Sequence, residues 1–140
     1  TYIDENGSKK RPVMLHRAIL GSMERFIGVL IESNSGKFPL WLAPTQLVIA
    51  SITDEASKYA KEIYQKCINE NLRVDLDIRN EKISYKIREH SNNKIPVIFV
   101  VGKNEIKDKS VSIRWLGSND QTVQTLKIAL DQIQNASYMP

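Results

Sequence analysis

From Thr45 to the end of the chain, apolar and polar residues follow the periods of strands and helices in turn. Residues 46–52 form a short β-prone run, and residues 74–79 alternate between apolar and charged, which predicts a strand with one more hydrated face. Residues 97–101 are continuously apolar, as is typical of a central strand buried on both faces. Residues 111–116 are predicted to form the last strand.

Two helices are expected between the first three strands. The first covers residues 54–71 and has Thr53 as its N-cap, and the acidic residues in its first turn suit the helix dipole. The second covers residues 81–92, with Ile83 and Ile87 four residues apart on its buried side.

The remainder of the chain completes the pattern. Residues 103–110 read as a polar turn into the last strand. Ser118 and Gln121 have the spacing of a capping box. They precede a helix whose apolar positions are Val123, Leu126, Leu130 and Ile133. The order βαβαββα, with crossovers through helices, predicts an α/β fold: a three-layer domain with a mixed, mostly parallel sheet flanked by helices.

A boundary is expected at residues 34–39, Asn-Ser-Gly-Lys-Phe-Pro, because these residue types end a helix and prevent its continuation. The sequence therefore divides into residues 1–36 and 37–140. The first unit is too short to be a complete catalytic fold, whereas the second has enough strands and amphipathic helices to close a core.

The first unit is predicted to be a β-ribbon followed by a helix. Asn6-Gly7 is a favoured hairpin dipeptide, so residues 1–5 and 12–16 are expected to pair as antiparallel strands. An apolar run that ends at Gly21 then leads into a helix with Ser22 as its N-cap.

Composition is that of an ordinary folded protein, since hydrophobic residues make up 41% and charged residues 26% of the 140 residues. No apolar stretch approaches the roughly 20 residues that span a bilayer. The chain begins without an initiator Met or a signal pattern, so we interpret it as excised from a larger protein. The single cysteine, Cys67, excludes an internal disulfide and favours a reducing, cytoplasmic setting. A net charge of +4 permits a polyanionic partner without requiring one.

Residues alone leave the chemistry open. His16 and Arg25 are read most simply as a structural histidine and a salt-bridge arginine. His90 reads as a helix-terminus or surface residue. Basic residues gather in the second half of the chain, where Lys82 and Lys86 read either as a solvated helix face or as part of a nucleic-acid surface. The second unit has no metal-ligand spacing and no glycine-rich phosphate loop.

Three motifs narrow these alternatives: HRAILGSMERFIG at residues 16–28, FPLWLAP at 38–44 and RNEKISYKIREH at 79–90. In this order and spacing the chain resembles the threonyl-tRNA synthetases, a family of class II aminoacyl-tRNA synthetases. The resemblance implies that residues 1–36 are the C-terminal end of a catalytic domain, including motif 3. It also implies that residues 37–140 are an anticodon-binding domain.

The resemblance assigns roles in the first unit. Arg25 becomes the catalytic arginine of motif 3, which contacts ATP phosphates, and Ser22 lines the same substrate pocket. His16 becomes one of three ligands of a zinc ion that recognises threonine. Zinc, ATP and magnesium are thus implied as cofactors of the full-length protein, with none expected on this chain by itself, and the full-length protein is implied to be a homodimer.

In the second unit, the resemblance assigns anticodon contacts to Asn80, Glu105 and Arg114, with Arg88 in support. Amide, carboxylate and guanidinium groups suit the free edges of splayed loop bases. Lysines, among them Lys82 and Lys86, would hold phosphates. Glu105 and Arg114 are expected at either end of the turn joining the third and fourth strands. Trp115 stands where the family often has a basic residue, and either stacks on a base or covers the sheet edge.

Two functions are therefore compared. In the first, the chain is the C-terminal part of a threonine–tRNA ligase, which attaches threonine to its tRNA using ATP, and this part recognises the tRNA anticodon. In the second, the chain is a non-catalytic RNA-binding accessory module derived from such a domain. His16 and Arg25 favour the first, because a binding module needs neither a zinc ligand nor an ATP-contacting arginine. Neither reading involves a membrane.

Overall fold

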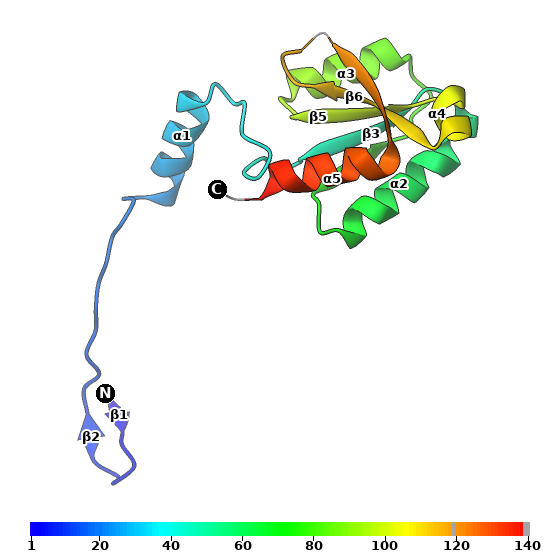
Figure 1. Ribbon diagram of the computed structural model, residues 1–140. Coiled ribbons are helices and arrows are strands. Elements are labelled where there is room, and N and C mark those ends of the chain that lie inside the picture. Colours follow the sequence, from blue (N-terminus) through cyan, green and yellow to red (C-terminus); the bar gives the residue numbers. More distant parts are fainter. Residues whose placement is uncertain (119, 139–140) are drawn as a thin grey trace.

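A computed structural model describes residues 1–118 and 120–138. Its helices and strands lie in two separate parts, a short N-terminal segment and an α/β domain (Figure 1). The N-terminal segment contains β1 (Tyr2–Ile3), β2 (Lys9–Lys10) and α1 (Met23–Ser33). The domain contains β3 (Leu47–Ser51), the 3₁₀ turn η1 (Asp54–Ala56), α2 (Ser57–Asn69), β4 (Val74–Asp77), α3 (Ile83–Asn92), β5 (Val97–Val101), α4 (Lys103–Asp108), β6 (Ser110–Trp115), β7 (Gln121–Thr125) and α5 (Leu126–Ser137).

The domain is built on one five-stranded sheet with the order β4-β3-β5-β6-β7. β3 is parallel to both β4 and β5, and β6 is antiparallel to both β5 and β7. Helices α2 and α5 cover one face of the sheet and α3 covers part of the other (Figure 1). This confirms the predicted mixed sheet flanked by helices. Its parallel share is smaller than expected, because β7 adds a second antiparallel pair.

The β7 strand corrects the predicted capping box. Gln121 begins a strand rather than the first turn of a helix, and Val123 on that strand is 64% exposed. The helix starts only at Leu126. Leu126 and Ile133 are both buried on one face of this helix, as the predicted helical period requires. A polar edge strand of the type Gln-Thr-Val-Gln-Thr has no strong apolar alternation, so pairing with β6 rather than local pattern determines its structure.

The core lies mainly between the sheet and helices α2 and α5. Val97, Phe99 and Val101 on the central strand are fully buried and pack there, together with Ile63 from α2. On the other face, a smaller cluster packs beneath α3. Cys67 is fully buried in α2, where it packs in the core, and this burial raises the pKa of its thiol to about 12.

Two expected local structures differ in detail. Thr53 precedes the first helix, but its hydroxyl makes no capping hydrogen bond and the first turn is 3₁₀ rather than α. Residues 103–110, expected to be a polar turn, contain the short helix α4, which Lys109 ends in the left-handed conformation with φ 48°. None of the described helices has the length and apolar character needed to cross a membrane.

The segment before β3 is attached to the domain by polar contacts. Arg73 donates from Nε to the Ala43 carbonyl at 3.0 Å and from Nη2 to the Trp41 carbonyl at 2.7 Å. Gln46, 2% exposed, donates to the Leu40 carbonyl at 2.9 Å and accepts from the Arg73 amide at 2.9 Å. Arg73 therefore holds this segment against β4 instead of joining a basic surface.

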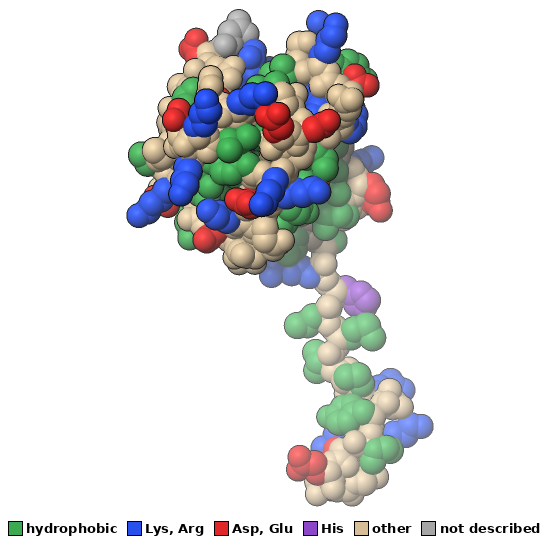
Figure 2. Space-filling view, turned by 90° about the vertical axis from the view of Figure 1, so that its right-hand side faces the viewer, with side chains coloured by type: hydrophobic (Ala, Val, Ile, Leu, Met, Phe, Trp, Pro, Cys, Tyr) green, Lys and Arg blue, Asp and Glu red, His purple; other side chains and the backbone are tan. Residues whose placement is uncertain are grey.

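The N-terminal segment forms a smaller hairpin than expected. Tyr2 pairs with Lys10 and Ile3 with Lys9, because the turn that closes from Asp4 to Ser8 fixes this register. The predicted strand at residues 12–16 is absent, and this stretch is extended without pairing. Pro12 lacks an amide hydrogen for a ladder. Figure 2 shows apolar side chains along this extended stretch, away from the domain.

Helix α1 forms where the sequence predicts it, with Ser22 as N-cap: its Oγ accepts from the Arg25 amide at 3.2 Å. No residue of α1 is buried. Removal of residues 1–35 is therefore expected to change the free energy of unfolding of the remainder by less than about 0.5 kcal/mol, as for surface changes. Urea unfolding of both forms checks this, and a non-cooperative transition in the shortened form would contradict it.

Candidate nucleic-acid interface

A polar cluster around the buried Asp77 and Lys86 fixes α3 on the sheet. Asp77, at the end of β4, has a side chain only 4% exposed, and its Oδ2 accepts from Arg79 Nη2 at 2.7 Å and His90 Nε2 at 2.8 Å. Lys86 of α3 is fully buried, with Nζ 3.6 Å from Asp77 Oδ1. The same Nζ donates to the Ser51 carbonyl at 2.9 Å and the Asp77 carbonyl at 3.2 Å. We refer to Asp77, Arg79, Lys86 and His90 as the Asp77 cluster.

Electrostatics in this cluster favour the ionised carboxylate. Burial by itself raises the pKa of Asp77, but hydrogen bonds from Arg79 and His90, with the Lys86 charge nearby, outweigh that effect. The pKa of Asp77 therefore lies well below its usual range. Arg79 also bonds Glu89 Oε2 at 2.6 Å, so one guanidinium joins the loop after β4 to the last turns of α3.

The cluster corrects three expectations. Lys86 does not lie on a solvated helix face or hold a phosphate, because its ammonium group is enclosed and bonded to protein carbonyls. Asp77 shares the predicted more hydrated face of its strand with the exposed Asp75, but contacts with α3 bury it there. His90 does lie near the end of α3, but its side chain is only 13% exposed, so it is not a surface residue.

Two of the expected anticodon contacts lie at the same edge of the sheet. Asn80 follows β4 and Glu105 follows β5, and the carboxyl ends of these like-oriented strands meet at one edge. Asn80 is exposed. Glu105 is half-buried, and its Oε2 accepts from the Gly102 amide at 2.9 Å, which orients the carboxylate at the start of α4.

Arg114 lies elsewhere, contrary to the expected position at an end of the turn. It is the register partner of Ile98, near the start of β5, whereas Glu105 follows the end of β5. Arg114 lies four positions along β6 from Ser110, about 13 Å at strand spacing. Glu105 and Arg114 therefore do not flank one turn. The structure instead groups Arg114 with the α3 side of the sheet, because Ile98 packs beneath Ile87 of α3.

Arg88 follows Ile87 on α3 and is exposed, so it belongs to the same side of the sheet as Arg114. On this side of the sheet, the α3 helix packs on β3 and β5. Among the described residues, no apolar cluster packs on β6 or β7 on the same side. Sequence reasoning missed Gln121 here, because it was read as part of a helix cap. Its register partner is Arg114.

Trp115 points to the opposite face from Arg114 and packs against the main core. It also lines a small apolar pocket with Phe38 and Leu40 from the segment before β3. This position favours the covering role over base stacking.

The three residues assigned to the first unit are not brought into one site by this chain. His16 is exposed, and its nearest polar contact is Met14 Sδ at 3.0 Å. Arg25 is exposed on α1, and Ser22 uses its hydroxyl as the helix cap. Among the described residues, no group of three His, Cys, Asp or Glu side chains is arranged to hold a metal.

Positive charge is distributed rather than concentrated. Figure 2 shows Lys and Arg interleaved with Asp and Glu over the side of the domain that carries α4. Arg79 pairs with Asp77 and Glu89, and Lys103 pairs with Glu55 at 3.1 Å. The basic residues that remain for a polyanion are therefore fewer than the sequence indicated.

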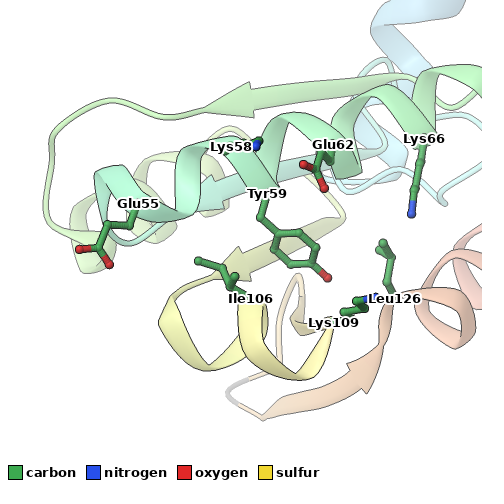
Figure 3. A pocket seen from close by; sticks show the side chains of 8 residues that line it. All are labelled: Glu55, Lys58, Tyr59, Glu62, Lys66, Ile106, Lys109 and Leu126. Atoms are coloured by element: carbon green, nitrogen blue, oxygen red, sulfur yellow. The ribbon is translucent and has the colours of Figure 1, made fainter.

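A pocket of mixed charge lies between α2, α4 and the start of α5 (Figure 3). Tyr59 extends into it from α2, donates to the Ser110 carbonyl at 3.2 Å, and contacts the same space as Lys109 and Leu126. Burial first, and then the charges of nearby glutamates, raise the pKa of Tyr59. None of the expected site residues lines this pocket.

Comparison with known proteins decides the family. A family model described as an anticodon-binding domain matches residues 46–136, which include the five-stranded sheet, α2 to α4 and all but the last residue of α5. The chain belongs to the anticodon-binding domain family. This sequence match confirms the expected fold class independently of the structure.

Similar proteins extend the likeness beyond the matched residues. The threonine–tRNA ligase of Paramagnetospirillum magneticum is 58% identical over 131 residues, which cover 94% of this chain and 20% of that protein. The ligase of Caulobacter vibrioides is 53% identical over 139 residues, or 99% of this chain and 21% of that protein. The chain therefore spans about a fifth of the length of the curated relatives that it matches.

A solved structure shares the architecture of this anticodon-binding domain. The RNA-binding domain of threonyl-tRNA synthetase from Cryptosporidium parvum superposes with a TM-score of 0.81 at 33% identity, covering 89% of this chain and 31% of that chain. A prolyl-tRNA synthetase from the same organism gives a TM-score of 0.66 at 24% identity, covering 79% of this chain and 26% of that chain. The latter supports the fold alone.

Proposed function

We propose that the chain is the C-terminal part of a threonine–tRNA ligase and that residues 37–140 recognise the anticodon of its tRNA. The observation that carries this proposal is the combination of the anticodon-binding family match over residues 46–136 with 52–60% identity to threonine–tRNA ligases along most of the chain. Similarity over residues 1–36 supports the ligase reading over the accessory-module reading.

In this proposal, the exposed side of the sheet beside α3 meets the anticodon loop. Arg114 presents a planar set of donors to a base edge, and Arg88 lies on the neighbouring helix. Asn80 and Glu105 address further bases from the edge of the sheet. Lys82, exposed at the start of α3, supplies a phosphate contact in place of the buried Lys86.

The full-length protein would bind ATP, magnesium, threonine and tRNA, and we further propose a homodimer in the cytoplasm. Residues 1–36 would end its catalytic domain. There the Arg25 guanidinium would neutralise phosphate charge during threonine activation, with Ser22 beside it. His16 by itself does not fit a zinc site, because catalytic zinc takes three protein ligands. We therefore propose His16 only as one ligand completed by the rest of that protein.

Base reading and phosphate binding can be separated by a matched pair of variants. Arg114→Ala is expected to weaken binding of a threonine-type anticodon stem-loop by about 1–3 kcal/mol and to reduce discrimination against altered anticodons, as for a base-contacting side chain. Lys82→Ala is expected to weaken all stem-loops alike and to lower the salt dependence. Titrations with cognate and altered stem-loops at two salt concentrations measure both effects. Equal loss for every anticodon in Arg114→Ala would contradict base reading.

A further inference from the structure

The uncovered side of β6 and β7 places a hydrogen-bond donor group and an acceptor group next to each other. Arg114 on β6 and Gln121 on β7 are register partners. Partners across an antiparallel pair project from the same face with their Cβ atoms about 4.5–5.5 Å apart. A ligand that contacts Arg114 on this face therefore also meets Gln121.

The side chain of Gln121 is held in place by β6. Its Nε2 donates to the hydroxyl of Ser112, which is 1% exposed and lies two residues before Arg114 on the same face. This bond draws the amide of Gln121 across β6 and uses one of its two N–H donors. Oε1 and the second N–H remain for a ligand, and no donor to Oε1 is found among the described residues.

Arg114 supplies the complementary group. Its guanidinium carries five N–H donors, and its side chain is half-buried without a hydrogen-bond acceptor in the part of the chain that the structure describes. The pair therefore fits a base edge that has an acceptor atom together with an exocyclic amino group. Uracil lacks an exocyclic amino group, whereas adenine, cytosine and guanine each have one together with an acceptor atom, which in guanine are the 2-amino group and O6.

We propose that Gln121 is a specificity-determining residue whose Oε1 accepts a hydrogen bond from the exocyclic amino group of an anticodon guanine, beside Arg114. This inference rests on the proposed anticodon recognition. Threonine codons begin with A and C, so their anticodons share a central guanine, and this base is the one that the pair reads. Discrimination between bases then depends on Gln121 of the edge strand β7 as well as on Arg114.

Inosine tests the proposal, because it differs from guanine only in lacking the 2-amino group. The complete chain is titrated with a threonine-type anticodon stem-loop that carries guanine or inosine at the centre. The wild type is expected to prefer guanine by about five- to tenfold, the effect of one neutral hydrogen bond. Gln121→Met, which keeps the side-chain length without the amide, is expected to reduce this preference to less than about twofold.

Gln124→Met is the matched control. Gln124 lies on the same strand, but it is the register partner of Val111, whose side chain belongs to the core face. The control should keep the guanine preference, and thermal unfolding should show that both variants fold. A preserved preference in Gln121→Met, or a wild type that binds guanine and inosine equally, would overturn the role of Gln121. A wild type that binds no stem-loop would instead contradict the proposed function itself.

Discussion

Asp77→Ala is expected to lower the free energy of unfolding by about 3–5 kcal/mol, because it leaves Lys86 buried without a counter-charge. Lys86 is fully buried, and its remaining partners would be backbone carbonyls. Chemical unfolding measures the change. The paired replacement Asp77→Leu with Lys86→Met removes both charges and should recover part of the loss, since a well-packed apolar pair avoids the desolvation cost.

Asp75→Ala provides the matched control for this experiment. Asp75 is an exposed carboxylate on the same strand and accepts one hydrogen bond, from Thr45 at 3.1 Å. Its removal is expected to cost less than about 1 kcal/mol, as for an exposed pair of polar groups. Similar losses for the two variants would show that burial of the Asp77 cluster has no special energetic weight.

Acid is expected to destabilise the domain through the same carboxylate. The folded-state pKa of Asp77 is lowered, because hydrogen bonds from Arg79 and His90 and the Lys86 charge outweigh the opposing effect of burial. A lowered folded-state pKa means that this stability is fully present above the unfolded value of about 4 and is lost as the pH falls toward the folded value. The loss should be roughly 2–3 kcal/mol, typical of one salt-bridged aspartate.

Urea unfolding at a series of pH values between 7 and 2.5 measures this dependence. Asp77→Asn, which cannot ionise, should be less stable at neutral pH and should lose less stability than the wild type below pH 4. Parallel pH profiles for the wild type and Asp77→Asn would assign the acid sensitivity to other carboxylates.

The sequence predicts the centre of this domain better than its edges. Residues 97–101 are apolar at every position, and that pattern is compatible with few structures other than a buried central strand. Helix α3 likewise forms around Ile83 and Ile87, as their spacing indicates. In contrast, β7 is polar and lies at an edge, so its conformation depends on β6 rather than on its own residues.

The burial of Lys86 shows the limit of local reasoning about the candidate site. A lysine on an amphipathic helix is normally solvated. Here its counter-charge comes from Asp77, nine residues away on strand β4, and one of its two carbonyl partners comes from Ser51 on β3. Neither is visible in the period of α3. The same reason explains why Gln121 could not be associated with Arg114 before the register of β6 and β7 was available.

The half-covered sheet also has an evolutionary consequence. Val111 and Ile113 point into the core from β6, whereas Arg114 on the same strand and its partner Gln121 on β7 lie on the side that no apolar cluster of the described residues covers. If this side binds the anticodon loop as proposed, substitutions at Arg114 and Gln121 alter what it recognises with little change to packing, because neither residue belongs to a core cluster. In an anticodon-binding domain of this kind, the proposed recognition surface can therefore diversify by small steps, because each intermediate still folds.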